Sequence, residues 1–376
     1  MTKITRYLAV LCLLNVCGLL VAGLGHRTRN QVTWLPEHNG IAFGLHGVAL
    51  ASVPRTQARD SSSCSVELWM KAADVTEAGT MLAFYSAEHD ITFRIRHSWT
   101  DIELRRAETS DRDARGLSRA IIDRVLRPGM SAFLTISSGT AGTELYLDGI
   151  LKQAIPRLKV SEADCTGQLV LGGSPRGGDL FVGWLRGLAI YPRALSRLEV
   201  SRHFHTWVES GRPDYTADET VRALYLFAEH SGNIAHSAQG AGVNLFIPER
   251  YMVVDEILLE APWNAFTPTW GYWEDIVINI CGFIPLGLVL CVYISLVWTQ
   301  RWALALTVTA GAALSLTIEI AQAHLPTRNS DLTDVITNTL GTFVGALFCR
   351  WVVGRLREWN TAGVLQSATL GLLHHR

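Results

Sequence analysis

The chain is long enough for two domains, and its charge argues against one class of partner. It has 376 residues, with 33 Lys and Arg against 34 Asp and Glu, so its formal net charge is −1. Because the sequence also lacks a basic tract, binding to nucleic acid has no support. Its apolar residues are concentrated near the two ends, which indicates a membrane protein with a soluble middle part.

Four apolar segments approach the roughly 20 residues needed to span a bilayer. They cover residues 7–25, 276–298, 302–323 and 335–353. The first follows Lys3 and Arg6, so it is either an uncleaved anchor, which we favour, or a cleaved signal peptide. The positive-inside rule places these two residues and Arg301 in the cytoplasm. We therefore expect cytoplasmic termini and residues 26–270 outside.

Residues 40–195 read as short strands separated by turns. In Ser65–Lys71, the apolar Val66, Leu68 and Met70 alternate with other residues and so share one face of a strand. Asp148-Gly149 lies between two further candidate strands and is a strong signal for a two-residue hairpin. Many strands with regular turns predict an all-β sandwich or jelly roll.

Further sequence marks narrow this interpretation. The strand that ends in Asp148-Gly149 and the closing strand before Tyr191-Pro-Arg-Ala-Leu-Ser196 resemble those of laminin-G-like, concanavalin A-like jelly rolls. Ser196 and Glu199 form a capping box that predicts a short helix to about Trp207. Residues 223–248 are expected to complete the same sandwich, because they are too few to bury a core of their own.

The resemblance indicates a fold more than a function. Related glucanases use the pattern Glu-x-Asp-x-x-Glu, and the nearest approach, around Glu162 and Asp164, lacks the second Glu, so we expect no catalysis there. Asp148 or Asp164 is a weak candidate ligand for Ca²⁺, although solvated turn acids are the preferred interpretation, and no other cofactor is expected. A glycan or an envelope protein could bind through aromatic loop residues such as Trp99, but a lone Trp more often belongs to the core, so we assign no site there.

Only two of the seven cysteines, Cys64 and Cys165, lie in the part predicted to be outside. An oxidising compartment favours a disulfide between them. Two buried thiols are the alternative, because the sequence does not give their separation.

We divide the chain into five parts. They are an anchor or signal at 1–25, the jelly roll at 26–248, an aromatic linker at 249–274, the membrane helices at 275–355 and a cytoplasmic tail at 356–376. The linker is rich in Trp and Tyr, which prefer the headgroup level of a bilayer. Residues 251–260 are a candidate for a short helix on the membrane surface.

Polar residues recur at helical spacing where the last two spans meet. They are Glu319, Gln322, Arg328, Asp331, Asp334 and Asn338, with Asn279 on the second span. The pattern Glu-x-x-Gln, Pro-x-Arg, Asp-x-x-Asp-x-x-x-Asn-x-x-Gly resembles the VanZ-like family of bacterial membrane proteins. The resemblance implies a bacterial cytoplasmic membrane, a role in the cell envelope and, for the named member, resistance to the glycopeptide teicoplanin.

Acidic and amide groups inside membrane helices are costly, so they are candidates for function. We expect the seven residues to form a polar pocket that opens outward and recognises an envelope lipid or lipid-linked precursor. Structural cross-linking of the helices is the alternative for these residues. There are two alternative functions: a lipid transporter or flippase, and an enzyme that acts on a lipid-linked substrate. Because no nucleophile or metal-ligand pattern is evident, we lean against an enzyme. The oligomeric state stays open.

Overall fold

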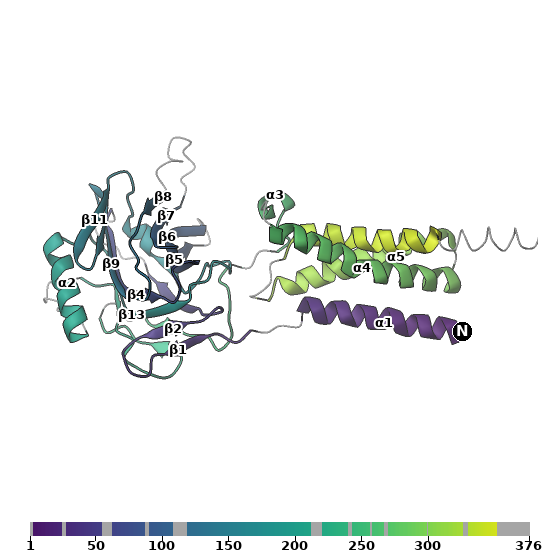
Figure 1. The fold of residues 1–376 in the computed structure, drawn as a ribbon, viewed down its shortest axis with the longest axis horizontal. Coiled ribbons are helices and arrows are strands. Elements are labelled where there is room, and N and C mark those ends of the chain that lie inside the picture. Colours follow the sequence, from purple (N-terminus) through teal and green to yellow (C-terminus); the bar gives the residue numbers. More distant parts are fainter. Residues whose placement is uncertain are drawn as a thin grey trace, which may run out of the picture. The chain divides into compact units, whose positions relative to one another are not determined.

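A computed structural model gives the fold of the chain (Figure 1). It describes residues 3–24, 28–54, 62–86, 90–107, 119–211, 220–239, 243–255, 258–266, 270–298, 300–325 and 330–351. The chain divides into two compact units. The sandwich unit is Arg27–Asp255, and the helical unit is Met1–His26 with Glu256–Arg376.

The sandwich unit contains two eight-stranded antiparallel sheets. The first runs in the order β1-β2-β13-β4-β9-β10-β11, and β14 also pairs with β13. Its strands are β1 (Val32–Trp34), β2 (Ile41–Phe43), β4 (Cys64–Ala72), β9 (Ala132–Gly139), β10 (Gly142–Leu147), β11 (Ile150–Ile155), β13 (Gly183–Tyr191) and β14 (Ala223–Tyr225). The predicted all-β sandwich is therefore confirmed.

The second sheet runs in the order β15-β16-β3-β12-β5-β6-β7-β8. Its strands are β3 (Ala49–Val53), β5 (Ala78–Ser86), β6 (Asp90–Ser98), β7 (Asp101–Arg106), β8 (Arg119–Ile122), β12 (Gly167–Leu171), β15 (Ile234–Ala235) and β16 (Leu245–Phe246). Residues 223–248 thus add strands to both sheets, so the prediction that they complete one sandwich is correct.

Local sequence signals account for several elements of the sandwich. Asp148 and Gly149 have φ angles of 50° and 75° and form the two-residue connection from β10 to β11. Ser196 and Glu199 form the predicted capping box at the start of α2 (Arg197–Ser210). The helix ends at Gly211, whose φ of 73° suits a glycine C-cap. These short-range predictions hold because each depends only on neighbouring residues.

Strand β4 is buried on both faces. Val66, Leu68 and Met70 point into the core between the sheets. The opposite face is covered by α2, which packs on the outside of the first sheet through residues such as Val200 and Trp207. Figure 1 shows α2 beside the strands of that sheet.

A disulfide joins Cys64 at the start of β4 to Cys165 at the end of the short 3₁₀ helix η2 (Glu162–Cys165). Cys165 lies just before β12, so the bond connects the two sheets. The alternative of two buried thiols is wrong.

The proposed surface helix at 251–260 is absent from the described residues of that range, 251–255 and 258–260. Tyr251 instead donates its N–H to Thr28 O at 3.1 Å, and Val254 donates to Pro175 O at 2.8 Å. The Tyr251 side chain is buried against the sandwich. These backbone bonds to the sandwich replace the intrahelical bonds that a helix would need.

The helical unit contains four helices that are long and apolar enough to cross a membrane. They are α1 (Lys3–Leu24), α4 (Trp270–Val297), α5 (Gln300–Gln322) and the helix Leu332–Trp351. A short helix, α3 (Pro262–Ala265), precedes α4. The four predicted spans are confirmed as helices.

Candidate functional site

The candidate site consists of polar residues near one end of the membrane helices. Six of the seven predicted residues lie in the part of the chain that the structure describes, whereas Arg328 lies outside it. Asn279 belongs to α4, and Glu319 and Gln322 belong to the last turn of α5. Asp331 precedes the helix Leu332–Trp351, which carries Asp334 and Asn338.

Glu319 connects the end of α5 to the start of the following helix. Its side chain is buried, with 1% exposure, and Glu319 Oε2 accepts the N–H of Asp331 at 2.9 Å. Asp331 Oδ1 in turn accepts the N–H of Thr333 at 2.7 Å, as an N-cap residue does. Both carboxylates therefore lie at a helix N-terminus, where the helix dipole favours negative charge.

Two further hydrogen bonds join the helix Leu332–Trp351 to its neighbours. Asn279 Nδ2 donates to Asp334 Oδ1 at 2.8 Å, which links this helix to α4. Asn338 Nδ2 donates to Ser315 Oγ at 2.9 Å, which links it to α5. The helical stripe of Asp331, Asp334 and Asn338 therefore contacts both neighbouring helices.

Gln322 brings α1 into the same region, which the sequence did not predict. Its Nε2 donates to Gly23 O at 3.1 Å. Apolar residues including Val16, Leu19 and Leu20 of α1 pack against α4 and α5. The first apolar segment therefore belongs to the helix bundle.

A segment before α4 also joins the site without having been predicted. Glu260 donates its N–H to Ser330 O at 2.8 Å and accepts the N–H of Leu332 at 3.0 Å. Ser330 Oγ accepts the N–H of Leu259 at 3.1 Å. These bonds form an isolated parallel bridge between Glu260 and Asp331, just before the helix Leu332–Trp351.

Two buried amide oxygens have no hydrogen-bond partner among the described residues. They are Gln322 Oε1 and Asn338 Oδ1. An unpaired buried acceptor costs about 1–3 kcal/mol, so each of these oxygens favours a nearby donor. The carboxylates and amide oxygens make the site rich in hydrogen-bond acceptors, which suits a ligand that carries hydroxyl or amine groups.

Glycines allow the helices at this site to approach closely. A Cβ atom added at Gly341 would lie 2.2 Å from Ile280 O, and one at Gly345 would lie 2.1 Å from Ile284 O. The Gly341-x-x-x-Gly345 spacing therefore marks a contact between backbones, as small residues do in membrane helix pairs.

The possible Ca²⁺ ligands of the sandwich have protein partners, and Asp164 is buried, so the prediction that it is a solvated turn acid is wrong. Asp148 Oδ1 accepts the N–H of Phe133 at 3.0 Å. Asp164 accepts two bonds from Ser161 and pairs with Arg106 at 3.0 Å. Within the described ranges, no group of three or more His, Cys, Asp or Glu side chains is placed to hold a metal ion.

One buried polar cluster in the sandwich escaped the sequence analysis. Glu67 on β4 is fully buried, accepts a bond from Tyr191 Oη at 2.7 Å and lies 3.1 Å from His203 Nδ1 of α2. Thr135 Oγ1 donates to the same carboxylate at 3.3 Å. Glu67 lies on the face of β4 that points away from the core between the sheets, where the sequence pattern predicts a solvent-exposed acid. It is buried because α2 covers this face, and the position of α2 could not be predicted from the sequence.

Comparisons with known proteins match both units. The concanavalin A-like lectin/glucanases superfamily model matches residues 46–201, and the VanZ/LLP1 family model matches residues 221–353. Protein VanZ of Enterococcus faecium is 40% identical over 83 residues, which cover 22% of this chain and 47% of that protein. The match thus spans about half the length of this curated relative.

Solved structures resemble the chain at low sequence identity. A structure from Bacteroides ovatus, provisionally assigned as a carbohydrate binding protein, has a TM-score of 0.40 and 10% identity, covering 61% of this chain and 63% of that one. The SAP-like pentraxin of Limulus polyphemus has a TM-score of 0.32 and 14% identity, covering 55% and 97%. The receptor binding domain of botulinum neurotoxin D has a TM-score of 0.37 and 16% identity, covering 56% and 61%.

The family boundary and the structural boundary differ. The VanZ/LLP1 match begins at residue 221, before β14, whereas the sandwich unit extends to Asp255. The family match therefore includes the last strands of the sandwich as well as α4, α5 and the helix Leu332–Trp351. Residues 46–201 are therefore similar to the concanavalin A-like lectin/glucanases superfamily and residues 221–353 to the VanZ/LLP1 family, and the described part of the chain carries four helices long and apolar enough to cross a membrane.

Proposed function

We propose that the chain is a bacterial cell-envelope protein whose VanZ-like helices recognise the polar head group of an envelope lipid or lipid-linked precursor. Its concanavalin A-like sandwich would bind an envelope glycan at the same time. The family matches support the envelope setting, and the polar residues of the helical unit support lipid recognition.

One observation carries the lipid part of this proposal. Acids and amides from α4, α5 and the helix Leu332–Trp351 gather in a unit whose helices are otherwise apolar. Such groups are costly in a membrane and are usually retained for a function. The buried oxygens of Gln322 and Asn338 would accept hydrogen bonds from hydroxyl or amine groups of the head group.

The proposal includes a topology. The site would lie at the outer face of the cytoplasmic membrane, with both termini in the cytoplasm and the sandwich outside. Exposed Trp263, Trp270 and Trp273 before and within the start of α4 support a position at the headgroup level. Because Gly23 accepts a bond from Gln322, α1 would remain in the mature protein as an anchor.

Isosteric variants separate recognition from structural cross-linking. Glu319→Gln and Asp334→Asn remove a charge but keep an oxygen for the bonds from Asp331 N–H and from Asn279. We expect both variants to reach normal abundance and to bind lipid about tenfold more weakly, because charge-assisted hydrogen bonds are the stronger ones. Glu274→Gln, an exposed acid at the start of α4, is the matched control.

Native mass spectrometry of the full-length protein with added phosphatidylethanolamine, phosphatidylglycerol and a polyprenyl-linked sugar measures the binding. If both variants retain the binding of the unaltered protein, the polar residues serve structure alone and the lipid proposal is wrong. Teicoplanin susceptibility of cells that express each form provides a second readout, since the VanZ-like resemblance implies resistance to that antibiotic.

A further inference from the structure

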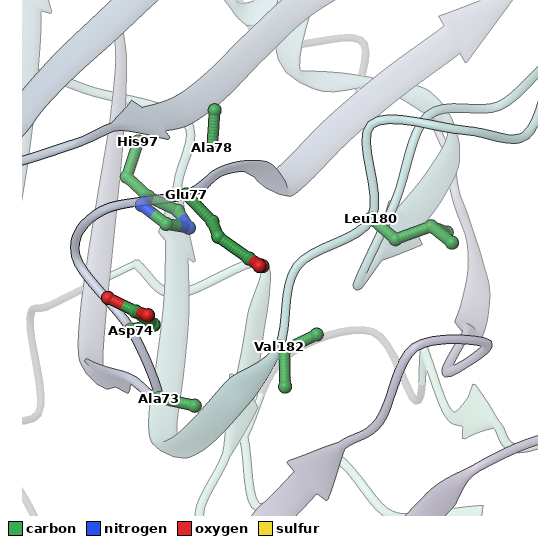
Figure 2. A pocket seen from close by; sticks show the side chains of 7 residues that line it. All are labelled: Ala73, Asp74, Glu77, Ala78, His97, Leu180 and Val182. Carbon is green, nitrogen blue, oxygen red and sulfur yellow. The ribbon is translucent and has the colours of Figure 1, made fainter. Parts of the chain in front are cut away.

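A small pocket opens beside the hairpin between β6 and β7 of the sandwich. It has a volume of about 70 Å³. Its polar lining residues are Asp74 and Glu77, in the turn between β4 and β5, and His97 near the end of β6. Leu180 and Val182, just before β13, supply apolar lining, and Figure 2 shows them across from the polar residues.

His97 has an unused polar atom at this pocket. The residue is 2% exposed, and among the described residues its Nδ1 has no hydrogen-bond partner. Its ring packs edge-on against Phe181 at 5.6 Å, which holds its orientation. Burial lowers the pKa of His97, while a hydrogen bond to the Trp99 backbone acts in the opposite direction, and the ring is neutral at neutral pH. That bond uses part of the ring's hydrogen-bonding capacity, and Nδ1 is the atom left for a ligand. A ligand group in the pocket could therefore satisfy Nδ1.

The two carboxylates make the pocket negative. Both residues are exposed, and neither forms an ion pair with any described residue. Asp74 Oδ1 accepts bonds from the N–H and hydroxyl of Thr76, and these bonds lower the pKa of Asp74. The pocket thus presents hydrogen-bond acceptors and would repel anions.

Trp99 lies next to the pocket in the turn from β6 to β7. Its N–H donates to Glu77 O at 2.9 Å, which fixes this turn against the pocket. The side chain is 65% exposed, and the backbone φ of 57° is the sign that the first residue of a two-residue hairpin turn takes, here between the paired Ser98 and Asp101. The exposed indole therefore offers a flat apolar face beside the pocket.

We propose that Trp99 and this pocket form a binding subsite for a pyranose that carries no acidic group. The apolar face of the sugar ring stacks on the indole, and an exocyclic hydroxyl or amide group enters the pocket. There it donates to Asp74 or Glu77 and pairs with His97 Nδ1. This subsite rests on the glycan-binding part of the proposed function and names its location and sugar class.

Size and charge restrict what the subsite can hold. A cavity of about 150 Å³ accommodates benzene, so this pocket admits a substituent rather than a whole ring. The uncompensated carboxylates exclude uronic acids and phosphorylated sugars, and they accept neutral or amino sugars.

Binding of defined oligosaccharides to the full-length protein in detergent tests this proposal. We expect oligomers of N-acetylglucosamine or of glucosamine to bind, and oligomers of galacturonate not to bind. Trp99→Asn removes the stacking surface but keeps a residue that tolerates positive φ, so it should fold normally and bind about tenfold more weakly. Glu77→Gln should weaken glucosamine binding in particular, while Glu209→Gln, an exposed acid on α2, should change nothing.

The outcomes separate the subsite from the broader function. If the unaltered protein binds these sugars and Trp99→Asn and Glu77→Gln bind them equally well, the subsite is wrong but glycan binding stands. If the unaltered protein binds no sugar in the set, both the subsite and the glycan-binding part of the proposed function fail. If galacturonate oligomers bind as well as the neutral ones, the charge argument and the subsite are refuted.

Discussion

The contacts that stabilise the sandwich internally differ from those that stabilise the helical unit internally. Among the residues that the structure describes, the largest fully buried side chains, including Trp207, Phe84 and Phe181, belong to the sandwich. The helices instead make their closest contacts through glycine, as at Gly341 and Gly345. In water, burial of large apolar side chains drives packing, whereas in lipid they gain little from each other. Close backbone approach and hydrogen bonds must then hold the helices.

This difference predicts that changes to the sandwich and to the helices act on separate units. Amide hydrogen exchange can be measured on the full-length protein in detergent. Peptides from the sandwich and peptides from the helices then give the protection of each unit separately in one experiment.

Loss of the disulfide should have the largest effect. Replacing Cys64 and Cys165 by Ala opens a loop with a sequence separation of 101 residues. In the chain-entropy model this costs about 4–5 kcal/mol of sandwich stability. Protection should fall throughout the sandwich and stay unchanged in α4 and α5. Equal protection with and without the bond would contradict this.

His203→Leu should destabilise the sandwich by a somewhat smaller amount. It removes one of the side-chain partners of the fully buried Glu67, which keeps Tyr191 and Thr135, and leaving a buried polar group short of a partner costs about 1–3 kcal/mol. His205→Leu on the same helix is the control, since His205 is exposed and should change stability by less than about 0.5 kcal/mol. Similar denaturation midpoints for the two variants would show that the buried cluster contributes little.

Gly345→Val should destabilise only the helical unit. Even a Cβ atom at this position would lie 2.1 Å from Ile284 O, so the helices must separate. Overpacking of this kind typically costs about 1–3 kcal/mol. Gly282→Val on α4 is the control, because a Cβ atom there meets nothing within 4 Å. Equal protection of α4 in both variants would argue against a glycine-mediated contact.

His97→Asn should change how the stability of the sandwich depends on pH. Desolvation holds the pKa of His97 below its ordinary value of 6.5 in the folded state. Below that pH the unfolded chain binds a proton that the folded chain does not, so stability falls as pH falls from 6.5 toward the lower folded pKa. The variant should reduce this slope by up to about 1.4 kcal/mol per pH unit. His38→Asn, at an exposed position, is the control, and parallel slopes for all three proteins would refute the expectation.

The candidate site was predicted from the sequence only in part. The spacing of Glu319 and Gln322, and of Asp331, Asp334 and Asn338, placed each set on one helical stripe. Which groups meet could not be predicted, because the bond between Asn279 and Asp334 depends on the packing of two helices. The contribution of Gly23 from the opposite end of the chain was not expected either. Whether these groups also recognise a lipid stays a prediction.

The sequence by itself determined the features that depend on neighbouring residues. Apolar length defined the four spans, alternation defined strands such as β4, and Asp148-Gly149 and Ser196-x-x-Glu199 defined a hairpin and a helix start. Only the tertiary structure decided which distant groups face each other. The bond between Cys64 and Cys165, the burial of Glu67 under α2 and the pocket of Asp74, Glu77 and His97 all join segments far apart in the chain. Local periodicity sets the direction of a side chain, whereas its partner is set by long-range packing.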